Sequence, residues 1–264
     1  MISVKDVFEY LNGIAPVSLK MDFDNAGLLV GDENGQVGRI LVALDITDEV
    51  IDEAIALGAE LIVSHHPLIF TPMKSVLSTD LVGRKIIKLI KYNISAICMH
   101  TNLDIAEGGV NDALIKALGA SSDSYLEFTG TDAGGISHGC GRVGELPNEM
   151  ELCDFLKVCK DSLNSNGLRY HDAGLKVKKL AVMGGSGGDC VALAKAMGCD
   201  TYVTSDIKYN AFLDAKELGI NLIDADHFCT ETVIVPVLSE KLGAAFPECE
   251  VRISEKHAQT AQFF

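Results

Sequence analysis

The sequence has no long apolar segment, and none of its hydrophobic runs approaches the ~18 residues that a helix needs to cross a bilayer. Its first residues, Met1–Val7, contain no charged region followed by an apolar core, so we expect no signal peptide. The two absences argue against a membrane protein and against a secreted one, and they favour a cytoplasmic location.

The eight cysteines include no Cys-x-x-Cys pair, the spacing that is typical of closed structural zinc sites. In a chain of 264 residues, scattered cysteines indicate reduced thiols rather than a disulfide framework. Several, such as Cys98 between Ile97 and Met99, have apolar neighbours and are expected to be small core residues.

Basic residues are scarce. The chain has 22 Lys and Arg but 37 Asp and Glu, which gives a formal charge of −15 at pH 7. A field of this sign repels nucleic acids and anionic membranes, so neither is an expected partner. It suits cation binding, although acidity alone is weak evidence for it. The hydrophobic fraction of 48% allows a compact fold of one large or two modest domains.

Strand-like and helix-like patterns alternate along the chain. Residues 3–13 have the apolar spacing of an amphipathic helix, and residues 80–92 carry a second broad apolar face. Strands are predicted at 39–44, 60–64, 94–99, 140–146, 175–183, 201–204 and 220–224. This alternation predicts an α/β fold with largely parallel sheets flanked by helices. Residues 119–141, rich in Ser, Thr, Asp and Gly, indicate a domain boundary or an exposed loop.

Three of the predicted strands end in side chains that can bind metal or transfer protons. These are His65 and His66, then His100 and Asp104, and finally His227 and Glu231. Polar side chains at the carboxyl ends of such strands point into the crevice where open α/β sheets bind ligands. His227 and Glu231 are four residues apart, so in a helix their Cβ atoms lie about 6 Å apart on one face. For His65 and His66 alone, one core histidine and one surface histidine would explain the pair equally well.

Imidazole and carboxylate groups together suit divalent zinc, iron, manganese or nickel. A bridging carboxylate with two or three ligands per ion would hold two metals roughly 3.5–4 Å apart. Open coordination positions would hold water and make it more acidic, which suits hydrolysis near neutral pH. The sequence therefore predicts two divalent metal ions per chain.

Other segments have both a structural and a functional interpretation. Gly184–Gly188 lies between a predicted strand and a helix, where backbone N–H groups can bind an anion, but a plain tight turn explains it equally well. Lys208 is either a cationic companion to that loop or a solvated helix lysine. Asp24 and Asn25 can form an Asx turn before the next strand.

The motifs around these residues resemble a known family over nearly the whole chain. The order and spacing are similar to those of the Nif-three-like dinuclear-metal-centre proteins, also catalogued as GTP cyclohydrolase type-two homologues. The three metal motifs that carry the resemblance are His65–Pro67, His100–Asp104 and His227–Glu231, with support from Asp24–Leu28, Gly141–Leu146, Gly184–Gly188 and Thr204–Lys208.

The resemblance implies a specific set of ligands for two metal ions. It names His65, His66, Asp104, His227 and Glu231. Glu231 would bridge the two ions. His100 is not a ligand by this resemblance, and we assign it a supporting or proton-transfer role.

The resemblance also implies two α/β lobes with the metal site in the cleft between them, assembled as a toroidal hexamer. We expect the first lobe at residues 1–130 with about 225–264, and the second at 131–224. The sequence departs from the pattern at Phe23, where tryptophan is common, and at Phe228, where tyrosine is common. Neither change removes a ligand, although the second removes a phenol.

The first functional hypothesis is a metal-dependent hydrolase that acts on a nucleotide or phosphoester-type substrate, and the family name points to ring opening of GTP. The second is metal storage, metal delivery or a scaffold for a partner protein, which the same five ligands would serve. A nucleic-acid-binding ring is disfavoured by the charge of −15.

Overall fold

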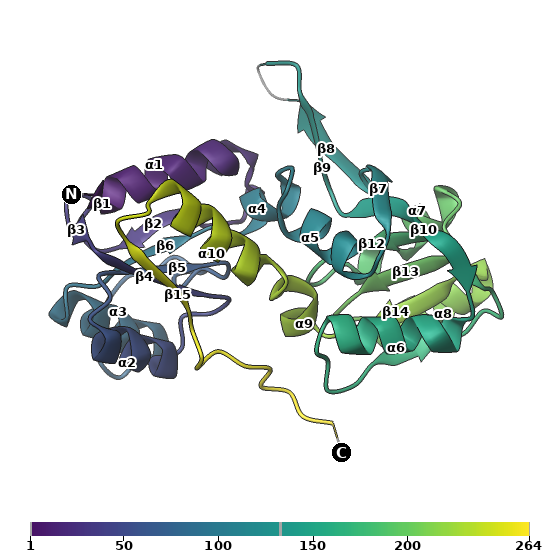
Figure 1. The fold of residues 1–264 in the computed structure, drawn as a ribbon. Coiled ribbons are helices and arrows are strands. Elements are labelled where there is room, and N and C mark those ends of the chain that lie inside the picture. Colours follow the sequence, from purple (N-terminus) through teal and green to yellow (C-terminus); the bar gives the residue numbers. More distant parts are fainter. Residues whose placement is uncertain (1, 132–133, 264) are drawn as a thin grey trace. The chain divides into compact units, whose positions relative to one another are not determined.

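A computed structural model of the chain describes residues 2–131 and 134–263. The chain folds into two compact units, which are described separately. The first unit is Met1–Ala106 with Val235–Ala258, and the second is Glu107–Ile234 with Gln259–Phe264. In each unit helices flank a sheet (Figure 1), which confirms the predicted α/β class. Within the described ranges, no helix is long and apolar enough to cross a membrane.

The first unit is built on a five-stranded sheet in which four neighbouring strands are parallel. In order across the sheet, the strands are β15 (Glu250–Ile253), β4 (Arg39–Ala43), β5 (Leu61–Ser64), β6 (Ser95–Cys98) and β2 (Gly27–Val30). Strand β2 is antiparallel to β6. Strands β5 and β6 are buried along their whole length, as expected for parallel strands covered on both faces.

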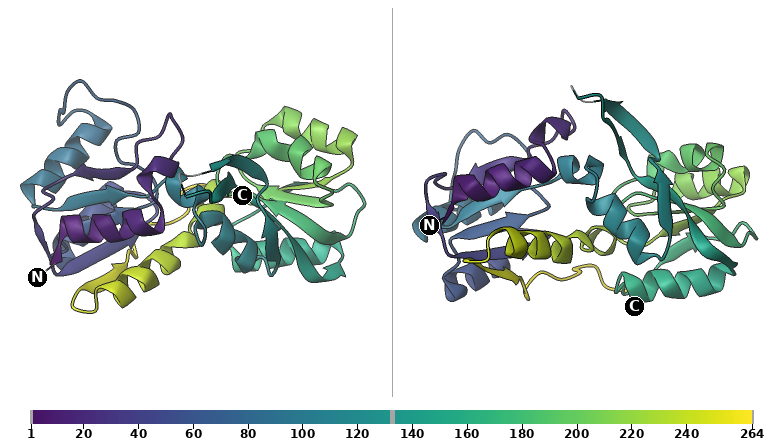
Figure 2. Two further views of the ribbon diagram at one scale, coloured as in Figure 1. Left: turned by 90° about the horizontal axis from the view of Figure 1, so that it is seen from above. Right: turned by 45° about the horizontal axis from the view of Figure 1, so that its top comes forward.

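Helices cover both faces of this sheet. They are α1 (Val4–Ile14), η1 (Val17–Leu19), α2 (Asp48–Leu57), α3 (Leu81–Lys91), α4 (Thr101–Ile105) and α10 (Ile234–Ala245), and a short ribbon pairs β1 (Ile2–Ser3) with β3 (Gln36–Val37). Helices α1 and α10 lie on one face and α2 and α3 on the other (Figures 1 and 2). Ser3 caps α1 in a capping box with Asp6, so the predicted helix 3–13 is confirmed.

The second unit has a six-stranded sheet whose centre is parallel and whose outer strands are antiparallel. In order, the strands are β11 (Arg169–His171), β14 (Asn221–Asp224), β13 (Thr201–Thr204), β12 (Val177–Val182), β10 (Arg142–Met150) and β7 (Ser121–Ser124). The prediction of largely parallel sheets therefore holds for the first unit, but in the second unit it holds only for β12, β13 and β14, because the strands outside them pair antiparallel with their neighbours.

Helices also cover both faces of the second sheet, with α5 and α6 on one side and α7 and α8 on the other (Figure 2). The helical segments are α5 (Val110–Ala117), α6 (Leu152–Ser162), η2 (Gly188–Cys190), α7 (Val191–Ala196), α8 (Tyr209–Leu218) and α9 (His227–Glu231). Phe155 of α6 and Leu114 of α5 pack with Leu180 of β12 in the core. Burying these side chains stabilises the unit by about 1.5–3 kcal/mol each.

Residues 119–141 contain strands that the sequence did not indicate. Besides β7, the antiparallel hairpin of β8 (Glu127–Thr131) and β9 (Ser137–Cys140) projects from the second unit (Figure 1). Strands β7 and β8 are almost entirely exposed, so no face carries the alternating apolar pattern from which strands are predicted. Residues 132 and 133 lie outside the described ranges.

Candidate metal centre

In the first unit, the carboxyl ends of three parallel strands bring polar residues to one edge of the sheet. The last residues of β4, β5 and β6 are in register, since Ala43 pairs with Ser64 and Ser64 pairs with Cys98. The chain continues into Asp45 after β4, into His65 and His66 after β5, and into His100 after β6. The fold therefore places the polar residues that follow these three strands at one edge of the sheet, the edge where open α/β sheets bind ligands.

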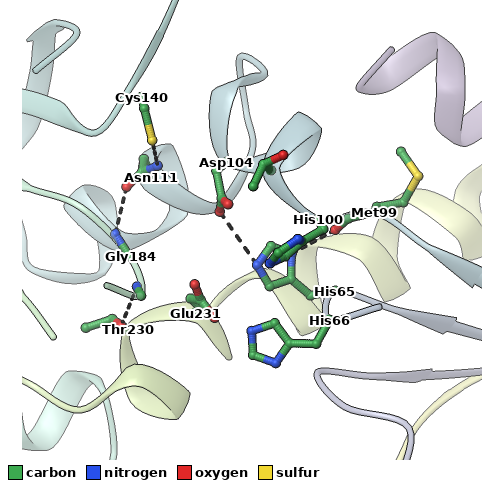
Figure 3. A network of polar contacts seen from close by, with 12 residues as sticks. His65, His66, Met99, His100, Asp104, Asn111, Cys140, Gly184, Thr230 and Glu231 are labelled. Carbon is green, nitrogen blue, oxygen red and sulfur yellow. Dashed lines mark hydrogen bonds and ion pairs between the residues drawn. The ribbon is translucent and has the colours of Figure 1, made fainter. Parts of the chain in front are cut away.

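The three histidines of this edge form one cluster. The His65 and His66 rings are 5.1 Å apart, and the His100 ring lies 5.3 Å from His65 and 5.7 Å from His66. One ring nitrogen of each lies within 4.8 Å of the others, which is close enough for a shared metal ion. Asp104, on the short helix α4, turns its Oδ1 to 3.6 Å from His65 Nε2 (Figure 3).

The orientation of each imidazole is set by an acceptor on its Nδ1 atom. Nδ1 of His65 lies 2.7 Å from the carbonyl oxygen of Met99, and Nδ1 of His66 lies 2.7 Å from Asp45 Oδ1. Nδ1 of His100 lies 2.6 Å from Oδ1 of Asp24. Carbonyl and carboxylate oxygens only accept, so the hydrogen sits on Nδ1 and the lone pair of the neutral ring sits on Nε2. This is the tautomer that binds metal through Nε2.

Asp24 is a carboxylate contacted by several hydrogen-bond donors. It is buried, and its Oδ2 accepts hydrogen bonds from the backbone N–H of Thr101 at 3.0 Å and from the Thr101 hydroxyl at 2.5 Å. Burial alone would raise the pKa of Asp24, but the hydrogen bonds from His100 and Thr101 outweigh it and hold that pKa well below its ordinary range. Asp24 Oδ1 also accepts from the N–H of Asn25 at 2.6 Å, but this bond reaches the adjacent residue, whereas an Asx turn bonds the N–H two residues on.

In the second unit, β14 leads into α9, which carries the other two predicted ligands. His227 and Glu231 lie on one face of this helix, with Nε2 of His227 3.1 Å from Oε2 of Glu231. Nδ1 of His227 is held by Asp206 Oδ2 at 2.8 Å, as in the histidines of the first unit. Asp206 has φ +53° and Asp226, the N-cap of α9, has φ +71° with ψ +137°. Such backbone strain clusters at functional sites and costs of order 1–3 kcal/mol.

The loop Gly184–Gly188 supports these ligands instead of offering its N–H groups to an anion. Gly184 N–H donates to Oδ1 of Asn111 at 2.9 Å and Gly185 N–H to Oγ1 of Thr230 at 3.1 Å (Figure 3). Gly187 N–H donates to Oγ1 of Thr204 at 3.0 Å. These bonds favour the tight-turn interpretation over the phosphate site.

At Gly185, both the backbone conformation and the neighbouring side chains require glycine. Its φ is +66°, and a Cβ placed there would lie 2.2 Å from Oε1 of Glu231 and 3.3 Å from Nε2 of His227. Any side chain would therefore push the Glu231 carboxylate away. Lys208, the other residue considered with this loop, is an exposed N-cap of α8.

The donor set fits divalent transition metals, because each unit turns imidazole Nε2 atoms toward a buried carboxylate. The nearby thiol does not belong to the set. Cys98 donates its S–H to the carbonyl oxygen of His65 at 2.9 Å, and burial raises the pKa of this thiol far above its ordinary range. A thiol must lose its proton to bind metal, so Cys98 acts as a buried core residue, as predicted.

Each of the six predicted site residues lies close to at least one other predicted site residue of the same unit. His65, His66, His100 and Asp104 gather in the first unit, and His227 and Glu231 gather in the second. The sequence analysis did not assign roles to Asp45 and Asp206, the carboxylates that orient His66 and His227. Both follow the carboxyl end of a parallel strand, which is the signal that would have identified them.

Comparison with known proteins gives a consistent family relationship. Residues 2–260 match the family Duf34/NIF3 (NGG1p interacting factor 3). A protein of Clostridium perfringens named "GTP cyclohydrolase 1 type 2 homolog" is 41% identical over 242 residues, which are 91% of each chain.

Solved structures agree with that relationship. A hypothetical protein of Staphylococcus aureus has a TM-score of 0.92 at 34% identity, over 99% of each chain. A Bacillus cereus protein related to NIF3 has a TM-score of 0.93 at 27% identity, over 100% of this chain and 99% of that one. This chain therefore belongs to the Duf34/NIF3 family.

Proposed function

We propose that this protein is a metal-dependent hydrolase with a dinuclear centre. Its five ligands are His65, His66, Asp104, His227 and Glu231. The observation that carries the proposal is that His65, His66 and His227 each have Nδ1 bound to a fixed acceptor, with Nε2 as the basic nitrogen. Histidines that serve only packing have no reason to share one tautomer.

Two bound divalent ions would act as Lewis acids and make a coordinated water acidic enough to react near neutral pH. Glu231 would be the bridging ligand, as the family resemblance implies, and its carboxylate is buried beside Nε2 of His227. His100 transfers the proton through Nε2, because Asp24 fixes its ring through Nδ1.

The substrate class is a nucleotide or another phosphoester. Support comes from the name of the Clostridium perfringens relative, a GTP cyclohydrolase 1 type 2 homologue, and ring opening of GTP is the specific form of the reaction. The protein would work in the cytoplasm as a homo-oligomer, in a ring of six subunits according to the family resemblance. Sedimentation of the purified protein measures that assembly directly.

The test is turnover by protein loaded with zinc, iron, manganese or nickel, on a panel of nucleotides and phosphoesters that includes GTP. We expect at least one substrate to be consumed, and we expect His100→Ala to slow its consumption by about 10²–10⁴-fold while metal content is unchanged. Full metal content without turnover of any panel member would instead favour storage, delivery or a scaffold role.

A further inference from the structure

Two exposed aromatic rings stand beside the imidazole cluster of the first unit. The side chains of Phe23 and Phe70 are 63% and 49% exposed, and their rings meet edge to face with centroids 6.3 Å apart. The Phe70 ring in turn lies 6.0 Å from the His100 ring at an interplanar angle of 86°. Aromatic side chains usually contribute to stability by being buried, so two adjacent exposed rings call for another explanation.

The loops that carry these rings are firmly held, so their exposure does not come from a slack segment. The Asn25 side chain donates to the carbonyl oxygen of Ile69 at 2.6 Å, which ties the loop of Phe23 to the loop of Phe70. Lys20 Nζ donates to the carbonyl oxygen of Asp24 at 2.7 Å. The Asp24 side chain is itself fixed by His100 and Thr101. The aromatic pair is therefore presented on the same framework that orients His100.

We propose that Phe23 and Phe70 form a platform on which the substrate stacks a planar heteroaromatic ring, such as a nucleobase. Aromatic side chains bind such rings through their faces, and exposed, preorganised rings bind them at low entropic cost. The contact between Phe70 and His100 makes the platform continuous with the imidazole cluster. A stacked ring would thus lie next to the proposed ligands, where its polar groups or its phosphates can reach the metal ions.

The charges around the platform argue against an anionic lipid surface as its occupant. Phe23 is flanked in the chain by Asp22 and Asp24, and the chain as a whole carries a formal charge of −15. A membrane-binding surface would instead need several basic residues around the exposed rings. The proposed occupant belongs to the nucleotide class named for the proposed function. The platform depends on that function only for the part of the substrate that would react at the metal ions.

The absence of tryptophan from the sequence allows a direct test, because Phe23→Trp introduces a single fluorescent reporter into the platform. The probe is guanosine 5′-monophosphate, and ribose 5-phosphate is the control that lacks the ring. Each is titrated against chelator-treated and zinc-loaded protein. We expect saturable quenching by the nucleotide in both forms and none by the sugar phosphate.

The second arm compares two alanine variants in the Phe23→Trp background. Phe70→Ala should weaken nucleotide binding about tenfold, as is typical of losing one stacking partner. Phe128→Ala, which removes an equally exposed phenyl ring (65%) from β8 of the second unit, should leave binding unchanged.

Equal quenching by both ligands, or equal effects of the two alanine variants, would overturn the platform. Failure of the metal proposal would appear separately, as protein that binds no zinc but still stacks the nucleotide. Failure of the platform alone would appear as protein that binds zinc normally while guanosine 5′-monophosphate quenches the Phe23→Trp fluorescence no more than ribose 5-phosphate does.

Discussion

The two units build their parts of the candidate centre in different ways from the same sheet geometry. In both, parallel strands lead into the proposed ligands or into residues that orient them, and a carboxylate holds Nδ1 of a histidine, Asp45 for His66 and Asp206 for His227. The first unit uses histidines that directly follow the strands β5 and β6. The second uses a short helix, α9, reached through a backbone with positive φ and packed against a glycine loop.

This difference shows two ways to fix a ligand. His65 is fully buried and is held by the carbonyl oxygen of Met99, so side-chain packing and hydrogen bonds set its position. Glu231 has its position limited by the Gly185 backbone, which approaches it more closely than a residue with a Cβ could. The first unit should therefore be sensitive to loss of polar partners, and the second to added volume.

The largest expected effect concerns stability, where the second unit depends on a buried ion pair. Arg142 is buried and binds Asp112 through two bonds of 2.7 and 2.8 Å. Asp112→Ala would leave the guanidinium buried without its carboxylate and should cost about 3–5 kcal/mol of unfolding free energy. In the first unit, Asp48→Ala removes the partly exposed partner of Arg84 and should cost less than about 1 kcal/mol. Urea unfolding measures both, and similar losses would contradict the contrast.

The next effect concerns the carboxylates that orient the histidines. Asp45→Asn and Asp206→Asn should each lower metal affinity by about 10–100-fold, because the imidazole loses the partner that sets its tautomer. Chelator competition measures the affinity. Asp52→Asn, which removes an exposed partner of Lys88, is the control and should change nothing. If only one of the two variants lost affinity for metal, the proposal that a carboxylate orients a metal ligand in both units would fail.

Asp24→Asn tests the hydrogen bonds of the first unit through pH. The folded pKa of Asp24 is below its ordinary value of 3.8, so its stabilisation is complete above that pH and disappears as the pH falls through the folded pKa. At pH 7 the variant should be about 2 kcal/mol less stable than the wild type.

That deficit should shrink as the pH falls below about 4, where protonation removes the same interactions from the wild type. Thermal unfolding of chelator-treated protein at several pH values measures this stability deficit. Asp22→Asn, at an exposed neighbour, should behave as wild type at every pH. A deficit that stayed constant with pH would rule out the charge of Asp24 as its cause.

The smallest effect tests the glycine loop of the second unit. Gly185→Ala should lower metal affinity by about tenfold, since its Cβ would displace the Glu231 carboxylate. Gly174→Ala is a matched control in the same unit, because its φ of +73° carries a similar backbone cost but nothing lies within 4 Å of the added Cβ. Both variants should lose about 1 kcal/mol of stability from the backbone. Only the first should lose metal, as measured by chelator competition.

Much of the fold could be predicted because the parallel strands are buried and strongly apolar. The predicted strands around 60–64 and 94–99 correspond to β5 and β6, and the histidines that follow them occupy one edge of the sheet. The hairpin β8–β9 could not be predicted, because β8 faces solvent, β9 is buried only at Gly139 and Cys140, and neither strand carries a periodic apolar pattern. The compositional change at 119–141 marks this hairpin, whereas the two compact units divide at Ala106.

The candidate site was predictable where residue type and strand end coincide. His227 and Glu231 share a face of α9 as their spacing indicated. The role of Gly185 was not predictable, because it depends on how closely the loop approaches Glu231, and spacing in the sequence does not report that distance. The use of Asp24 by both His100 and Thr101 likewise depends on contacts between residues far apart in the chain.

The central proposal is that His65, His66, Asp104, His227 and Glu231 hold two metal ions. Elemental analysis of protein purified without chelator tests it most directly, with His66→Ala and Glu231→Ala beside the wild type and His171→Ala as the control histidine. We expect about two transition-metal ions per chain in the wild type and the control, and loss of most of both ions from each of the other variants. Less than about a tenth of an equivalent in the wild type, or loss of a single ion from each variant, would contradict the proposed dinuclear centre.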